Sequence, residues 1–456
     1  MLNIKKLFVL SLKLLAVFST MHAEASVNLS VPLPVPSFST APIGMHEPQV
    51  NVSGQQVLKQ VTRLLELQDL QAASIELRQG LGEHKPTNAA LLYTLATIEL
   101  QQNQTKSAVS SLNQALAALP DFTRAQSVLA GIYTQQGEFD MARPLLQAAI
   151  KRQASASLYG MLAYGYLKQQ VYLAAKAAYQ QAIVLDGLNN SYLKGLLQVN
   201  IALQEWSSAE SILQTLLSQQ TMEAELLLVR ANIAQHRGED IAAINSLQLA
   251  LSLNGKTSSQ TNNIRWQLAQ MYLKVGAFGS ANQTLTSLVN QETLPEPKQI
   301  VVALDYLLIM GQAKQVKQLA SSLLSNPAAN QSFQSELWML LGRAELTFQR
   351  DANAASAFAK AVKANPLNGE AYIQQALLLR SSNQQQAQIL LARAADIETS
   401  AVRALTLQAQ ILLDIKAYDR ALLALTKAYR LAPDTHGLKE NLSSVERLVQ
   451  LAQTQL

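Results

Sequence analysis

The feature that most restricts the fold of this chain is a pattern that recurs about every 34 residues. A small residue, usually alanine, is followed by an apolar residue four positions later and by a small or apolar residue seven positions later. The residues that open these patterns are Ala73, Ala108, Ala142, Ala175, Ala209, Ala243, Ala281, Val316, Ala354, Ala387 and Ala421. A repeat of this period predicts an array of stacked small units in place of one globular core, and it covers roughly residues 54–434.

Each unit divides into two amphipathic halves. In residues 123–154, Leu129 and Tyr133 share one helical face in the first half, and Ala142 and Leu146 share one in the second half. Residues spaced by three, four and seven positions lie on the same side of a helix. A small residue near the start of the second helix lets its backbone approach the first helix closely. We therefore expect every unit to be a helical hairpin that stacks on the next one.

These units resemble the tetratricopeptide repeat family. One copy carries Trp338, Leu341, Gly342, Ala354, Phe358, Ala361 and Pro366 at the family's spacing, with Glu345 where the family usually has Tyr. Two units are weaker matches: residues 297–327, with Val316 in place of Ala, and residues 369–397, whose turn is short. The resemblance implies an all-α fold, a right-handed superhelical solenoid of about eleven helix-turn-helix units. Residues 435–456 then form a C-terminal capping helix, with Leu438, Leu442, Val445, Leu448 and Leu451 as its apolar stripe.

The N-terminus, residues 1–25, is typical of a signal peptide. Lys5 and Lys6 precede the apolar run LFVLSLKLLAVF, and small residues at Ala23 and Ala25 offer a cleavage site. We expect an exported protein, most simply a periplasmic one, and the alternative is an inner-membrane anchor formed by an uncleaved signal. No later stretch is long and apolar enough to predict a membrane span in the mature chain.

Residues 26–53 form a proline-rich linker, which contains five of the 13 prolines. Closely spaced prolines favour extended polyproline II and oppose helix, so a semi-rigid tether is expected; a docking strip for a partner is the alternative.

Composition and motifs argue against several functions. The chain has no Cys, which excludes disulfides, thiolate metal sites and a Cys nucleophile. Removal of residues 1–25 leaves 33 basic and 30 acidic residues, so charge gives no support for a nucleic-acid partner. No HExxH spacing, GxSxG elbow or complete phosphate loop is present. We therefore expect no enzyme activity, no cofactor and no metal.

The resemblance also implies where partners bind, because the first helices of such repeats line a concave face. The positions carried over to this chain are Tyr93, Arg124, Tyr164, Lys194, Gln198, Asn232, Asn263, Trp266, Met339, Arg343, Arg380 and Arg403. Aromatic, amide and Arg side chains suit a polar peptide or protein segment. For Trp266 and Tyr164 the alternative is packing between neighbouring units. Gln198 follows Lys194 where a carboxylate clamp for chaperone C-termini needs Asn, so that clamp is not expected.

The function expected from the sequence is a non-catalytic scaffold that holds other proteins of the bacterial cell envelope. Exopolysaccharide secretion and surface-appendage biogenesis are the assemblies suggested by the architecture, by analogy alone. The alternative is a periplasmic protein that binds polysaccharide or peptide in the concave groove, with Trp266, Tyr164 and Tyr93 stacking on sugars.

Overall fold

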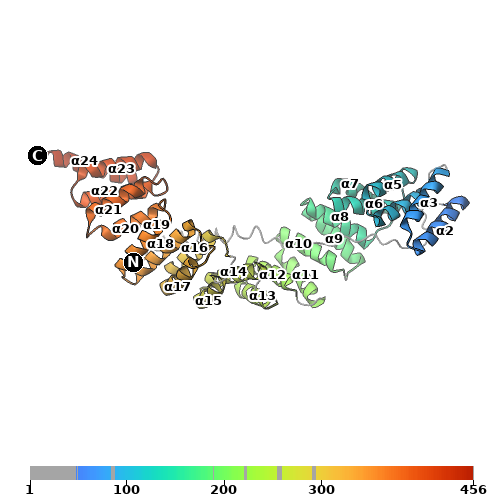
Figure 1. The fold of residues 1–456 in the computed structure, drawn as a ribbon, viewed down its shortest axis with the longest axis horizontal. Helices are drawn as coiled ribbons and strands as arrows, with labels where there is room; N and C mark the ends of the chain where they lie inside the picture. Colours follow the sequence, from blue (N-terminus) through green and yellow to red (C-terminus); the bar gives the residue numbers. More distant parts are fainter. Residues whose placement is uncertain are drawn as a thin grey trace. The chain divides into compact units, whose positions relative to one another are not determined.

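The computed structural model describes residues 48, 50–83, 88–187, 189–219, 223–253, 259–289 and 294–454. Those residues form 23 α-helices and no strand (Figure 1). The expected signal peptide and the linker up to residue 47 lie outside the described residues. None of the described helices has the length and apolar character needed to cross a membrane. The prediction of an all-α fold is confirmed.

The helices fall into two compact units, and the boundary between them in the sequence lies between Glu239 and Asp240. The first unit contains α2 (Val52–Glu66), α3 (Leu70–Glu83), α4 (Ala89–Gln101), α5 (Thr105–Ala118), α6 (Thr123–Gln136), α7 (Phe139–Arg152), α8 (Ala156–Lys168), α9 (Tyr172–Leu185), α10 (Asn190–Ala202), α11 (Trp206–Gln219) and α12 (Ala224–His236). The second unit contains α13 (Asp240–Leu253), α14 (Ser259–Lys274), α15 (Phe278–Val289), α16 (Pro297–Ile309), α17 (Ala313–Leu324), α18 (Gln331–Thr347), α19 (Asp351–Ala364), α20 (Gly369–Leu379), α21 (Gln384–Ala395), α22 (Ala401–Asp414), α23 (Tyr418–Leu431) and α24 (Leu438–Thr454).

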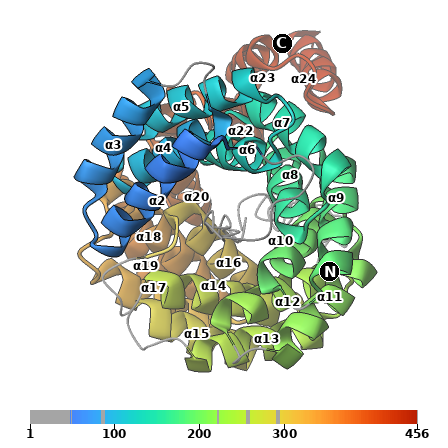
Figure 2. The ribbon, with the colours of Figure 1, turned by 90° about the vertical axis from the view of Figure 1, so that its right-hand side faces the viewer.

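Within each unit, consecutive helices pack as antiparallel hairpins, and each hairpin packs on the next one. In the second unit, for example, α18 contacts α19, and α19 in turn contacts α20. The even-numbered helices α2 to α22 are the first helices of the repeats, and the odd-numbered helices α3 to α23 are the second. Figure 2 shows the first helices on the inner side of each unit and the second helices on the outer side, as with α8 and α9 or α14 and α15.

The repeat register predicted from the sequence is confirmed at each of the eleven repeats. Each small residue that opens the repeat pattern is the fourth residue of a second helix, from Ala73 in α3 to Ala421 in α23. All eleven are buried, and Ala142, at 1 %, is the most exposed of them. Val316 is buried as completely as the alanines, so the weaker repeat at residues 297–327 still forms a hairpin.

A left-handed residue ends the first helix of nearly every repeat. It lies five residues before the buried small residue, as Gly137 (φ 78°) does before Ala142. Glycine adopts this conformation without steric cost, yet five repeats place Gln68, Gln170, Gln204, Gln349 or Lys416 there, and Asn103 occupies it once. The repeat at residues 369–397 has no such residue, which agrees with the irregular turn noted in its sequence.

Close packing between Gly342 and Phe358 explains the spacing of the most family-like copy. A β-carbon added to Gly342 would lie 2.3 Å from Cε1 of Phe358, well inside van der Waals contact. The Phe358 side chain is fully buried, so its ring has no free space to occupy instead. Glycine on the first helix and a large ring on the second therefore bring α18 and α19 together.

Two buried carboxylates, Glu99 and Glu345, occupy the position where the family has Tyr. Glu99 accepts hydrogen bonds from Arg78 at 3.0 Å and from Ser111 at 2.8 Å, and Glu345 forms an ion pair with Lys317. Arg78 and Lys317 both come from the second helix of the preceding repeat. The hydrogen bond from Lys317 lowers the pKa of Glu345, although burial acts in the opposite direction. These carboxylates thus stabilise the stacking of successive repeats.

The terminal helix α24 packs on α23 and closes the second unit. Leu438 and Val445 are buried as the sequence predicts. Leu448 and Leu451 are exposed, and Val449 is buried in place of Leu448. The apolar stripe therefore follows the spacing of a straight α-helix, and the predicted placement of Leu448 and Leu451 is corrected.

Candidate functional site

Four successive first helices of the second unit, α16, α18, α20 and α22, form a hollow of about 490 Å³. This volume lies in the range of ligand pockets in proteins. The hollow combines charged, amide and apolar side chains, and its lining residues are Val301, Val302, Asp305, Glu336, Met339, Leu340, Arg343, Asn368, Glu370, Gln374 and Arg403. Arg343, Arg403 and Met339, which the sequence predicts on the partner-binding face, come together here.

The arginines of this face are paired across the repeats. Arg343 on α18 forms an ion pair with Asp305 on α16, and Arg403 on α22 forms one with Glu370 on α20. Arg380, at the end of α20, binds Asp414 on α22, with 2.7 Å between Nη2 and Oδ2. Each pair joins the first helices of neighbouring repeats and is partly exposed, so its contribution to stability is about 1 kcal/mol at most.

Glu336 is the third carboxylate of the hollow and has a different environment. Among the described residues it forms no ion pair, and its only hydrogen-bonding neighbour is the amide of Asn368, whose Nδ2 is 3.5 Å from Oε1. Partial burial of the carboxyl group raises the pKa of Glu336, and the negative charge of Glu370 raises it further. The hollow therefore contains one carboxylate that lacks a cationic partner.

Asn368 has a fixed orientation because all its polar atoms are engaged. Its Nδ2 donates to Oγ of Ser335 at 3.0 Å, and its Oδ1 accepts from the backbone N–H of Ala371 at 3.2 Å, which caps α20. Ser335 in turn donates to the backbone carbonyl of Ala361 at 2.8 Å. This buried chain of hydrogen bonds holds the edge of the hollow beside Glu336 in place.

Trp266 and Met339, two residues of the predicted binding face, are buried. Trp266 is 5 % exposed and belongs to a core cluster with Leu273 and Leu304. Trp266 therefore packs between neighbouring repeats, which is the alternative considered for it from the sequence. Successive residues of a helix point about 100° apart, so a residue at the edge of the inner face can be covered by a neighbouring repeat. The sequence of one repeat does not show whether this happens. Met339 reaches the edge of the hollow but is 6 % exposed.

The predicted residues of the first unit lie on successive first helices, α4, α6, α8, α10 and α12. Tyr93 packs against Phe122 with ring centroids 5.0 Å apart, and Tyr164 packs edge-on against Phe139 at 6.2 Å. Lys194 forms an ion pair with Glu223 at 3.4 Å. Arg124, Gln198 and Asn232 are half-buried, and Asn263 of the second unit is exposed.

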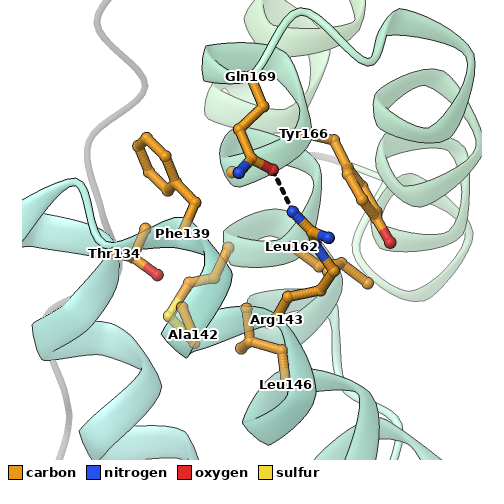
Figure 3. A pocket seen from close by; sticks show the side chains of 10 residues that line it. Thr134, Phe139, Ala142, Arg143, Leu146, Leu162, Tyr166 and Gln169 are labelled. Carbon is orange, nitrogen blue, oxygen red and sulfur yellow. Dashed lines mark hydrogen bonds between the residues drawn. The ribbon is translucent and has the colours of Figure 1, made fainter.

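A small cavity in the first unit lies between α7 and α8 (Figure 3). Arg143 donates a hydrogen bond to Gln169 at its edge, and its guanidinium lies 5.6 Å from the ring centroid of Tyr166. The volume of about 10 Å³ is barely that of one water molecule, so this cavity is a packing gap and no ligand site. Within the described ranges, no group of three or more His, Asp or Glu side chains could hold a metal ion.

Sequence reasoning missed the carboxylates that pair with the arginines, although the sequence contains a signal for them. Asp305 precedes Arg343 by 38 residues, Glu370 precedes Arg403 by 33, and Arg380 precedes Asp414 by 34. Each separation is one repeat to within one residue, so equivalent or adjacent positions of neighbouring repeats carry opposite charges. A search for opposite charges one period apart would have found all three pairs.

Comparison with known proteins identifies the repeats. Residues 99–163 and 320–369 match models of the tetratricopeptide repeat family. These two segments are tetratricopeptide repeats. Proteins built from tetratricopeptide repeats are generally protein-interaction scaffolds, and the fold is typically non-catalytic. No curated protein matches the sequence.

Several solved structures are similar to this chain at low identity. A tetratricopeptide repeat protein from Parabacteroides merdae is 15 % identical with a TM-score of 0.37, over 72 % of this chain and 100 % of that protein. pilF of Pseudomonas aeruginosa is 16 % identical with a TM-score of 0.38, over 47 % of this chain and 97 % of that protein. PilW, a type IV pilus biogenesis factor, is 16 % identical with a TM-score of 0.38, over 47 % of this chain and 99 % of that protein.

Proposed function

We propose that this protein is a non-catalytic scaffold that holds other proteins of a bacterial cell envelope in an assembly. Exopolysaccharide secretion and surface-appendage biogenesis are the two kinds of assembly that we put forward. The export signal expected in residues 1–25 supports the compartment, and the tetratricopeptide repeats support the scaffold role. Stacked repeats offer a long surface on which several partners can each use a few units.

The observation that carries the proposal is the hollow formed by α16, α18, α20 and α22. It is built from four successive repeats, so a segment lying in it contacts several repeats at once. Val301 and Val302 provide apolar area, while Asp305, Arg343 and Glu370 provide fixed charges. Apolar contact with a surround of polar groups is typical of protein-interaction surfaces.

Polysaccharide binding, the alternative considered from the sequence, depends on three aromatic side chains. Trp266 is buried, and the rings of Tyr93 and Tyr164 pack against Phe122 and Phe139. No observation therefore favours a row of exposed rings on which sugars could stack.

Affinity purification from an envelope extract tests the proposal with two matched variants. Gln374→Arg places a bulky cation in the hollow, and Gln385→Arg makes the same change on the second helix of the same repeat, where the side chain is exposed. We expect defined envelope proteins to be retained by the unchanged protein and by Gln385→Arg, and to be lost with Gln374→Arg. Equal retention by both variants, or binding to a glycan array without retained proteins, would contradict the proposal.

A further inference from the structure

The charges of the hollow are unbalanced. Asp305, Glu336 and Glu370 contribute three carboxylates to its lining, whereas Arg343 and Arg403 contribute two guanidinium groups. Both guanidinium groups already form ion pairs, with Asp305 and Glu370 respectively. One negative charge, on Glu336, remains without a cationic partner among the described residues.

We propose that the hollow accepts a cationic side chain, Lys or Arg, from a segment of the partner protein, which inserts between Glu336 and Glu370. This inference rests on the proposed scaffold function and specifies the chemistry of the partner. A cation at this place pairs with the partly buried carboxylate of Glu336 and also relieves its weaker repulsion with Glu370.

The surroundings of Glu336 suit a long cationic side chain. Lys and Arg cover apolar surface with their aliphatic stems while the charged end reaches a polar group. Val301 and Val302 line the same hollow and are half-buried, which leaves apolar area for such a stem. Asn368 holds the carboxylate of Glu336 from one side and is itself locked by Ser335 and by the backbone of Ala371.

An acidic partner segment fits the hollow less well. It would have to displace Asp305 from Arg343 or Glu370 from Arg403 before either guanidinium could bind it. It would also bring a further negative charge close to Glu336. Two negative charges placed side by side repel each other and oppose binding.

Selection of peptides tests the inference directly. A display library of random dodecapeptides is selected on the protein purified after expression of its full-length gene. The affinities of the selected peptides for the unchanged protein and for the variants Glu336→Gln and Glu446→Gln are then measured. Gln keeps the size and the hydrogen-bonding oxygen of Glu336 and removes its charge. Glu446 on α24 is exposed, far along the chain from the hollow, and serves as the matched control.

We expect the selected peptides to contain a Lys or Arg whose replacement by Met weakens binding at least about tenfold, as for other charge pairs shielded at an interface. Glu336→Gln should weaken binding by a similar factor, and Glu446→Gln should leave it unchanged. Binding should also weaken as ionic strength rises, because the hollow remains open to water.

The two proposals fail in different ways. If acidic or uncharged peptides are selected, or if Glu336→Gln binds the selected peptides normally, the cationic side chain is refuted while the scaffold function stands. If no peptide is selected and no envelope protein is retained in the purification described above, both proposals are refuted.

Discussion

Substitution of Gly342 by alanine tests the close approach of α18 and α19. The new methyl group would lie 2.3 Å from Cε1, 2.6 Å from Cδ1 and 2.8 Å from Cζ of Phe358. The ring is fully buried, so it cannot rotate into solvent, and the two helices must separate to admit the methyl group.

The expected loss of stability follows from two opposing effects. Inserting a methyl group into a well-packed core costs about 1–3 kcal/mol, and a contact with a buried ring belongs at the upper end of that range. Alanine gains about 0.8–1.0 kcal/mol over glycine in the interior of a helix. The net result is a destabilisation of about 2 kcal/mol, which is roughly a 30-fold increase in the population of the locally open form.

Hydrogen exchange of the amides in α18 and α19 measures this effect locally, which matters because repeat arrays do not unfold as one cooperative unit. Gly131→Ala in α6 is the matched control. Its methyl group would meet only Sδ of Met161, at 3.8 Å, an ordinary contact. The same substitution should therefore stabilise α6 by about 1 kcal/mol through helix propensity.

Opposite signs for the two substitutions are the expected result. If Gly342→Ala slows exchange or leaves it unchanged, the contact between Gly342 and Phe358 does not limit how closely these helices pack, and the explanation of the spacing is wrong.

Three further substitutions test other parts of the structure. Gln349→Gly should stabilise the hairpin of α18 and α19 by about 1 kcal/mol, seen as slower hydrogen exchange of its amides, because Gln349 is left-handed with φ 57°; faster exchange would contradict this account of the turn. Asn330→Ala should cost about 1 kcal/mol, since Oδ1 of Asn330 accepts the N–H of Phe333 at 2.9 Å and caps α18; the effect should appear as faster exchange in its first turn. Glu345→Gln should cost about 2 kcal/mol at neutral pH through the loss of a charged hydrogen bond from Lys317. Because the pKa of Glu345 is lowered in the folded protein, its contribution to stability is complete above the ordinary pKa of 4.5 and is lost as the pH falls below that value. As the pH is lowered from about 5 to about 3, a range that spans the ordinary carboxyl pKa, the variant should therefore lose less stability than the unchanged protein.

The repeat register could be predicted from the sequence because it depends on local volume. The position that Ala354 occupies needs a small side chain because the second helix of a repeat crosses the first helix closely there. Gly342 has to be smaller still because it lies opposite Phe358. Such requirements recur at each unit, so eleven weak patterns together define one architecture. The left-handed turn residues follow the same period, although Gln or Lys often occupies the position that suits glycine best.

The binding face was less predictable, because its character depends on contacts between repeats. Arg343, Arg380 and Arg403 are cationic in the sequence, but each is neutralised by a carboxylate one repeat away. Glu336 did not stand out, since nothing in its own repeat indicates that it lacks a cation. Burial of Trp266 likewise depends on how its neighbours in the stack cover α14.

Photocrosslinking in intact cells is the most direct test that partners bind in the hollow. A benzophenone amino acid is placed at Gln374, which lines the hollow, and separately at Gln385 on the outer second helix of the same repeat. We predict a discrete protein adduct from position 374 and none from position 385, with the crosslinked partner peptide containing Lys or Arg. Adducts from position 385 alone, or from neither position, would contradict the claim that this inner surface holds the partner.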